Sequence, residues 1–288
     1  MSATLREAIT TGGTERVTSV AGACAALGLS RSTWYRQHEP TLLPDRDMEL
    51  RDRIQKIALA KSVYGYRRMT AQLGRLGVVV NHKRVLRIMR EDNLLCLRKR
   101  HFVATTDSEH GLPVYPNLAR GLHVDAINRL WVADITYIRL RGEFIYLAVI
   151  LDAYSRRVIG WELSRRIDTA LTVGALKMAL CARQVKPGMI HHSDRGVQYA
   201  SIEYTTRLKE AGVTISMSRR GNPYDNAQAE SFMKTLKYEE VYLSDYANLT
   251  EARRSIAHFL DQVYNRERLH SRLKYVPPEE FEAGLSPT

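Results

Sequence analysis

The chain has 288 residues, 44% of them hydrophobic, and a formal charge of +12 from 43 lysine and arginine residues against 31 aspartate and glutamate residues. This length allows two or three domains with hydrophobic cores, so the composition excludes a chain that is disordered throughout. No apolar run approaches the roughly 18 residues that a membrane span needs, which excludes an integral membrane protein. Each cation that displaces a counterion adds affinity for nucleic acid, so the charge predicts a nucleic-acid partner.

The cysteines and the amino terminus indicate a reducing compartment. Cys24, Cys96 and Cys181 lie far apart and form no C-x-x-C pair, so neither a disulfide framework nor a cysteine-rich zinc site is expected. The first ten residues, MSATLREAIT, lack the charged start and apolar stretch of a signal peptide. We therefore expect a cytoplasmic protein without a membrane partner.

A first helix-turn-helix is predicted within residues 1–58. In the segment 20–37, a helix of small residues breaks at Gly28, and Ser30 can cap a second helix. This helix pair resembles the DNA-reading pair of helix-turn-helix domains. The predicted DNA contacts are Arg31 and Ser32.

A second helix-turn-helix domain is predicted over residues 59–104. Residues 61–104 contain eleven basic and two acidic residues. Apolar positions at helical spacing predict helices over 69–77 and 82–95, with Gly77 ending the first. Although a basic run is often only a solvated helix face, two basic helix pairs in one chain favour DNA binding. The predicted DNA contacts are Tyr64, Arg67, Arg68, Lys83, Arg84 and Arg87.

A different architecture follows a proline-containing linker at residues 105–127. An α/β catalytic domain is predicted over 128–240 and a helical extension over 241–288. Strands are predicted at 129–140, 143–152, 156–163, 188–192 and 213–217, and helices at 169–183, 201–212, 249–267 and 277–284. The first three strands form an antiparallel meander, and the later strand–helix alternation indicates a mixed five-stranded sheet.

Three carboxylates in this domain are candidates for catalysis. Asp134 lies in the middle of a strand with few polar residues, where an unpaired carboxylate would cost several kcal/mol if it were buried. Asp194 follows the end of a strand, which is where α/β sheets place ligand sites. Glu230 lies on a helix whose opposite side carries Phe232 and Leu236. The residues that share the face of Glu230 are Asn226, Lys234 and Lys237.

The spacing of these acids resembles that of a known enzyme group. Thirty-five residues separate Asp194 from Glu230, as in the DD(35)E catalytic domain of retroviral integrases and insertion-sequence transposases. The chain most closely resembles the downstream-frame transposases of bacterial elements with two reading frames. The similar motifs are YGYRRMTAQL, NHKRVLRIM, WVADITYI, LDAYSRRVIGWELS, HHSDRGVQYAS, SRRGNPYDNAQAESFMKTLK and YNRERLHSRLKYVPPEEF.

The resemblance implies a ribonuclease-H-like core that nicks transposon ends and transfers the released 3′-hydroxyl to another phosphodiester. Asp134, Asp194 and Glu230 would be the ligands of two Mg²⁺ ions, for which Mn²⁺ can substitute, with Asp134 bridging both. Lys237, and less directly Lys234, would contact DNA phosphates. The implied partners are double-stranded DNA at the terminal inverted repeats and at the target, a second copy of this chain, and the upstream-frame protein or a fusion with it. The implied location is the bacterial nucleoid.

Other interpretations remain open from the sequence. A DNA-binding regulator with an inactive integrase-like core would have the same basic amino-terminal half. Asp152 is the position where the fourth carboxylate of a true ribonuclease H would lie, although it also fits a turn, and Asp225 fits a helix N-cap. His191 and His192 resemble metal ligands by type, but they alternate on a strand and should point to opposite faces.

Overall fold

The computed structural model describes residues 20–26, 28, 30–33, 47–94, 112–219 and 226–285. The chain divides into two compact units, residues 1–55 and 56–288, and each is described by itself. No helix in the described ranges is long and apolar enough to cross a membrane.

In the first unit, helix α2 (Val20–Ala26) is followed by Gly28, whose φ of +63° lies in the left-handed region that glycine adopts readily. The hydroxyl of Ser30 then accepts a hydrogen bond of 3.1 Å from the backbone N–H three residues later. The predicted break at Gly28 and cap at Ser30 are therefore confirmed. Arg31 and Ser32 are exposed, and most of the second helix expected here lies outside the described residues.

The second helix pair is present in the larger unit. It is preceded by α4 (Met48–Ala60) and consists of α5 (Tyr66–Arg75) and α6 (His82–Glu91). Gly77, at φ +79°, lies just after α5, and the side chain of Asn81 caps α6 by accepting the N–H of the second helical residue. The apolar stripes of both helices are buried, as predicted, through Met69, Leu73, Val85, Ile88 and Met89. The helix pair is confirmed, although α5 starts three residues earlier and α6 ends four residues sooner than predicted.

The α/β domain contains the expected mixed sheet of five strands, in the order β3-β2-β1-β4-β5. The strands are β1 (Leu130–Arg139), β2 (Phe144–Asp152), β3 (Val158–Ser164), β4 (Ile190–Ser193) and β5 (Thr214–Met217). The meander β1-β2-β3 is antiparallel, whereas β4 pairs in parallel with both β1 and β5. The two parallel pairs require the helical crossovers that the alternating pattern predicted.

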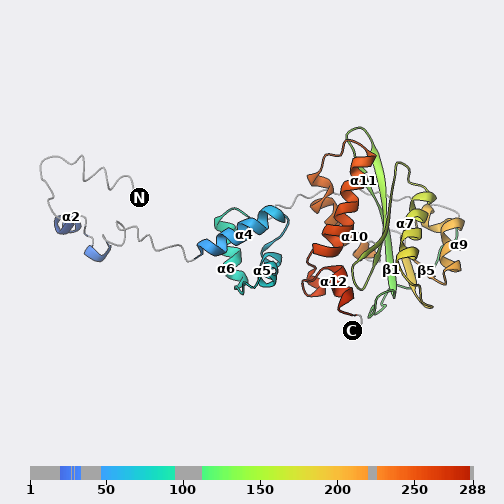
Figure 1. Cartoon of the computed structure of the whole chain (residues 1–288), viewed down its shortest axis with the longest axis horizontal. Coiled ribbons are helices and arrows are strands. Elements are labelled where there is room, and N and C mark those ends of the chain that lie inside the picture. The colour runs from blue at the N-terminus through green and yellow to red at the C-terminus, as the bar shows by residue number, and fades with distance from the viewer. Residues whose placement is uncertain are drawn as a thin grey trace. The chain divides into compact units, whose positions relative to one another are not determined.

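Helices cover both faces of the sheet (Figure 1). One core includes residues of α7 (Thr169–Ala182), α8 (Val197–Ala200) and α9 (Ile202–Glu210). Helix α7 approaches β3 very closely at Gly160, where an added Cβ would lie 2.2 Å from a backbone oxygen of α7, so only glycine fits there. The opposite core includes residues of α10 (Ala227–Glu239) and α11 (Leu249–His258). Figure 1 shows β1 between α10 and α7.

The helix expected over 249–267 changes type along its length. It is α-helical through His258 and continues as the π-helix η3 (Phe259–Glu267). The amide of Asn265 pairs with both backbone groups of Val158 on β3, at 3.0 Å each, and we attribute the wider turn to this anchor. Because Tyr246, Ile256, Phe259 and Leu260 belong to the same core as α10, no break in packing separates the helices after residue 240 from the sheet.

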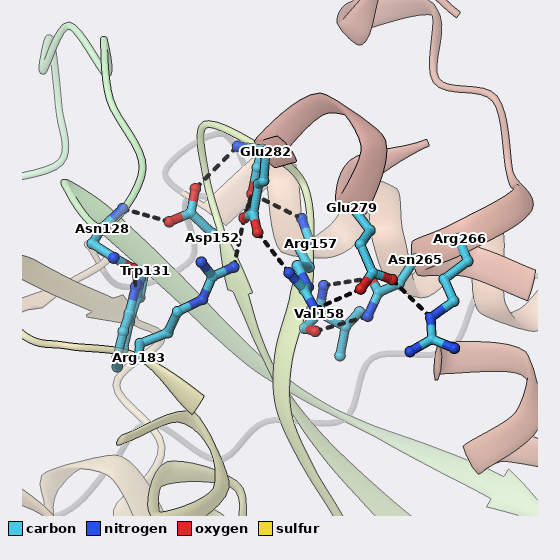
Figure 2. A network of polar contacts seen from close by, with 11 residues as sticks. Asn128, Trp131, Asp152, Arg157, Val158, Arg183, Asn265, Arg266, Glu279 and Glu282 are labelled. Carbon is cyan, nitrogen blue, oxygen red and sulfur yellow. Dashed lines mark hydrogen bonds and ion pairs between the residues drawn. The ribbon is translucent and has the colours of Figure 1, made fainter. Parts of the chain in front are cut away.

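A polar network fixes the last helix, α12 (Pro278–Ala283), to the sheet (Figure 2). Glu282 is buried, and its carboxylate accepts hydrogen bonds from the guanidinium groups of Arg183 and Arg157 and from the hydroxyl of Ser155. The helix itself was predicted from the sequence. Its attachment through Glu282 was not.

Candidate active site

Strand pairing brings the first two candidate acids together. Strands β1 and β4 pair in parallel with Val132 opposite His192, so the same register continued by two residues places Asp134 beside Asp194, just after β4 ends. Val132 packs in the core that contains α10. Since side chains two residues apart on a strand share a face, Asp134 points toward the side of the sheet that α10 covers.

Helix α10 lies along β1 and brings Glu230 to the same place. The side-chain amide of Asn226, at the N-cap of the helix, donates a hydrogen bond of 3.0 Å to the backbone oxygen of Ala133. Near the other end, the ammonium of Lys237 lies 4.2 Å from the centroid of the Tyr137 ring. Glu230 is one helical turn after the anchored N-cap and therefore lies close to Asp134, the residue after Ala133.

The charges of the three acids act on one another. The pKa of Asp134 rises from an ordinary 3.8 to about 8, chiefly because the carboxyl is desolvated, and further because Asp194 and Glu230 are negatively charged. The hydrogen bond of 2.9 Å from the backbone N–H of Ile135 and the charge of Lys237 oppose this shift. A cation bound between the acids would relieve the repulsion.

The donor set fits divalent magnesium by chemistry and charge. Hard Mg²⁺ binds carboxylate oxygens together with water and phosphate oxygens, and three acids supply the first of these. Across the ranges that the structure describes, no three acidic, histidine or cysteine side chains are close enough to hold one ion. Asp194 instead uses one carboxylate oxygen to accept the N–H of Gly196 at 2.9 Å. The acids thus share one site without forming a closed set of ligands.

Comparison with known proteins decides the family. The Integrase core domain family matches residues 125–223 and again 211–278, and the HTH-like domain family matches 45–102. The Insertion element IS600 uncharacterized 31 kDa protein of Shigella sonnei is 40% identical over 90% of this chain and 96% of its own length. Transposase InsF for insertion sequence IS3A, from Escherichia coli (strain K12), is 35% identical over 92% of this chain and 94% of its own length. The chain belongs to the insertion-sequence transposases.

Among solved structures, the simian T-cell lymphotropic virus intasome in complex with PP2A regulatory subunit B56 gamma is similar to this transposase. The alignment has a TM-score of 0.47 and 19% identity, and it covers 82% of this chain and 75% of that chain.

Asn226 does not lie where the sequence placed it. It was expected to face DNA together with Glu230, but it is buried, and its amide is bonded to β1. In this transposase Asn226 therefore positions α10. Asp225, the expected N-cap, lies outside the described residues, and Asn226 occupies the N-cap position. The prediction that Phe232 and Leu236 face the core is confirmed, since both are buried.

The two histidines of β4 have structural partners on different elements. Nε2 of His191 lies 3.0 Å from the hydroxyl of Tyr204 on α9, and the pKa of His191 falls to about 3 because the ring is buried and because His192 is adjacent. The ring of His192 lies between the hydroxyls of Ser216 and Ser218, at 2.8 and 3.0 Å. These bonds account for both nitrogens of His192 and for Nε2 of His191, whereas Nδ1 of His191 is buried without a hydrogen-bond partner among the described residues.

Asp152 is engaged by the backbone. One carboxylate oxygen accepts the N–H of Asn128 at 2.6 Å, and the other accepts those of Tyr154 and Ser155 at 2.9 and 3.0 Å. Figure 2 shows Asp152 between Asn128 and the segment that leads to Arg157. The acid thus fixes the turn after β2, as the sequence suggested.

The predicted DNA contacts of the second helix pair fall into two groups. Arg67, Lys83, Arg84 and Arg87 are exposed on α5 and α6. Tyr64 and Arg68 instead contact the carboxy-terminal part of the chain. The Tyr64 hydroxyl accepts the N–H of Leu269 at 3.3 Å, and the Arg68 guanidinium lies 3.3 Å from the carboxylate of Glu239 on α10.

Two sets of residues escaped the sequence analysis. One is the network around Glu282, and the other is the cavity in which Arg68, already predicted as a DNA contact, meets Arg156, Arg268 and Arg272 from distant segments. All four arginines lie in motifs that carry the family resemblance, but nothing in the sequence indicated that they meet.

Proposed function

We propose that this transposase cuts DNA at the ends of its element and joins the released 3′-hydroxyl to another phosphodiester, with Asp134, Asp194 and Glu230 as ligands of two Mg²⁺ ions. The observation that carries the proposal is the pairing of β1 with β4, which places Asp134 beside Asp194 on the face that α10 covers. Mn²⁺ would substitute because it accepts the same oxygen ligands.

When bound, the ions would lower the pKa of an attacking water or hydroxyl and neutralise charge on the leaving oxygen. The residues of the chain hold and orient the reactants. The backbone N–H of Ile135 orients the carboxylate of Asp134, and the amide of Asn226 fixes α10 to the backbone oxygen of Ala133. The charge of Lys237 lowers the pKa of Asp134, so the ammonium lies near the three acids. It can therefore bind a phosphate of the DNA strand that is cut there.

The remaining basic residues fit the duplex around this site. Exposed Lys83, Arg84, Arg87 and Arg67 can bind phosphates of a terminal inverted repeat, and Lys234 is exposed on α10. Arg31 and Ser32 would contribute in the same way. Joining DNA at two ends requires at least two copies of the chain, with the upstream-frame protein or a fusion as a further partner.

The test compares the wild-type chain with Asp134→Asn and Glu230→Gln on labelled element-end DNA, in Mg²⁺, Mn²⁺ or EDTA. Glu203→Gln is the matched control, because it removes an exposed carboxylate on α9. We expect metal-dependent nicked and joined strands from wild type and control, and a loss of more than about 10³-fold in both site variants.

DNA binding by the site variants should persist in EDTA, which separates catalysis from recognition. If Asp134→Asn or Glu230→Gln cleaved DNA at the wild-type rate, the assignment of these ligands would be wrong. If the wild type bound DNA but did not cleave it, even with the upstream-frame protein added, the chain would act as a DNA-binding regulator.

A further inference from the structure

A basic cavity of about 270 Å³ lies beside α10, away from the three acids. Arg68 of α5, Arg156 of the β2–β3 turn, and Arg268 and Arg272 after η3 line it together with Ser231 and Thr235 of α10. These arginines come from three segments that are far apart in the sequence. Their convergence is therefore a property of the fold.

The cavity has more positive than negative charge. Arg68 and Arg268 share one carboxylate, that of Glu239, at 3.3 and 2.7 Å. Nε of Arg156 is buried and has no hydrogen-bond partner, and Arg272 is exposed and forms no ion pair within the described ranges. The one acid in the lining is Asp152, whose two oxygens are already bonded to backbone N–H groups.

Neighbouring groups report a strongly positive potential. The pKa of His270 falls to about 2 because the ring is buried and because Arg268, Arg68 and Arg156 surround it. The pKa of Arg156 is lowered by burial, and Arg272 lowers it further. Unopposed like charges destabilise a fold unless a ligand of opposite charge binds between them.

The cavity and the acids lie on different flanks of one helix. Ser231 and Thr235 are four residues apart and share a stripe of α10, whereas Glu230 and Lys234 lie on another. Phe232 and Leu236 lie between the two stripes on the buried side. The two stripes are about 100° apart around the helix axis, and Val132, which lines the cavity, lies two residues before Asp134, so the two sites are neighbours separated by roughly 10 Å.

We propose that the Arg68–Arg156–Arg268–Arg272 cavity binds a backbone phosphate of the DNA strand whose scissile phosphate lies at the three acids. This assignment rests on the proposed function. Guanidinium groups bind phosphate oxygens in pairs, and the hydroxyls of Ser231 and Thr235 add donors. The short separation between the two sites places this phosphate within a few nucleotides of the cleavage position. Arg68 links that phosphate to the helix pair α5–α6.

The test variant is Arg272→Ala in the full chain, because Arg272 is exposed and its removal leaves the core intact. Arg254→Ala is the matched control, since it removes the same charge from an exposed position of α11 outside the cavity. Binding of a labelled element-end duplex is measured in EDTA across a series of salt concentrations. We expect Arg272→Ala to reduce the slope of log K against log salt by about 1, and Arg254→Ala to leave the slope unchanged.

Ethylation interference locates the phosphate. In the wild type, ethylation of one phosphate within a few nucleotides of the cut should block binding, and in Arg272→Ala the same ethylation should have no effect. Arg272→Lys keeps the charge but not the paired donors and should recover only part of the affinity. An unchanged slope together with unchanged interference in Arg272→Ala would overturn the proposal.

Two further measurements keep the outcomes distinct. The first is the melting temperature with inorganic phosphate. If phosphate raised it in wild type but not in Arg272→Ala, while the two proteins gave the same ethylation pattern, the cavity would bind a free anion and not the DNA strand. Thermal stabilisation by Mg²⁺ in EDTA-treated protein reports the three acids alone. It should be the same in Arg272→Ala and wild type, and its absence from both would contradict the proposed metal site and not the phosphate cavity.

Discussion

The network around Glu282 and the two flanks of α10 use charge in opposite ways. At Glu282, a buried carboxylate is paired with Arg183, Arg157 and a serine hydroxyl, and Arg157 also pairs with Glu279, so each charged group is balanced by a partner of opposite sign. On one flank of α10 carboxylates gather with one another, and on the other arginines outnumber their acids. Balanced charge of the first kind holds elements together, whereas the like charges of the second kind lower stability until a ligand binds.

The comparison predicts a large loss of stability from Glu282→Gln. The substitution removes the buried negative charge and turns one acceptor oxygen into an NH₂ donor that faces a guanidinium group, and we expect the free energy of unfolding to fall by about 3 kcal/mol. Urea denaturation measures this loss. A change below about 0.5 kcal/mol would show that the network does not hold α12 in place.

At Asp134 the same kind of substitution, carboxylate to amide, should raise the free energy of unfolding of the metal-free protein. Because the folded pKa is about 8 and the ordinary value is 3.8, the contribution of Asp134 is fully present below pH 4 and is lost as the pH rises through 8. At pH 8 in EDTA, Asp134→Asn should therefore unfold with a free energy about 2 kcal/mol higher than wild type, allowing for solvent screening. Mg²⁺ should raise the melting temperature of wild type only. Equal stability of both proteins at pH 4 and at pH 8 would contradict this reasoning.

The contribution of Glu282 to stability should also depend on pH in the acid range, in the opposite direction to that of Asp134. Burial raises the pKa of Glu282, but the hydrogen bonds from Arg183, Ser155 and Arg157 outweigh burial and lower it below its ordinary 4.5. This contribution is present above pH 4.5 and disappears as the pH falls through the folded pKa. The stability difference between wild type and Glu282→Gln should thus shrink by about 1 kcal/mol between pH 6 and pH 3 in chemical denaturation. A difference independent of pH would assign the effect to packing.

The smallest effect is expected from an exposed pair. Arg207 and Glu203 lie 3.2 Å apart on the surface of α9. Glu203→Gln should change the free energy of unfolding by about 0.3 kcal/mol, because solvent screens the pair. Differential scanning calorimetry at low and high salt would measure it. A loss comparable to that of Glu282→Gln would remove the distinction between surface and buried charge.

The sequence was sufficient where local pattern determines structure. Alternating strands, helical stripes and the capping residue Ser30 predicted the sheet, the helix pairs and the breaks at Gly28 and Gly77. The positions of Asp134 on a strand and of Asp194 just after one followed from the same patterns. Their roles as metal ligands stay a proposal.

The sequence was insufficient where distant segments meet. Tyr64 and Asn226 have the composition of DNA contacts, but partners far along the chain engage them, and Arg68 pairs with Glu239 at the edge of the basic cavity. The π-helical turn and the basic cavity depend on tertiary contacts in the same way. Residue type and spacing report what a side chain can do. Only the folded structure shows which partner contacts that side chain.

The pairing of β1 with β4 has a consequence for how such chains can vary in length. Asp134 and Asp194 are held in place by adjacent strands, so insertions in the loops between β2, β3 and α7 would leave both carboxylates where they are. Helix α10 has less freedom, because Asn226 at its N-cap is fixed to the backbone oxygen of Ala133. Longer loops between β2, β3 and α7 should therefore be tolerated. An added residue early in α10 would instead turn the rest of the helix by about 100°, which would displace Glu230 from the acids and Ser231 and Thr235 from the arginine cavity together.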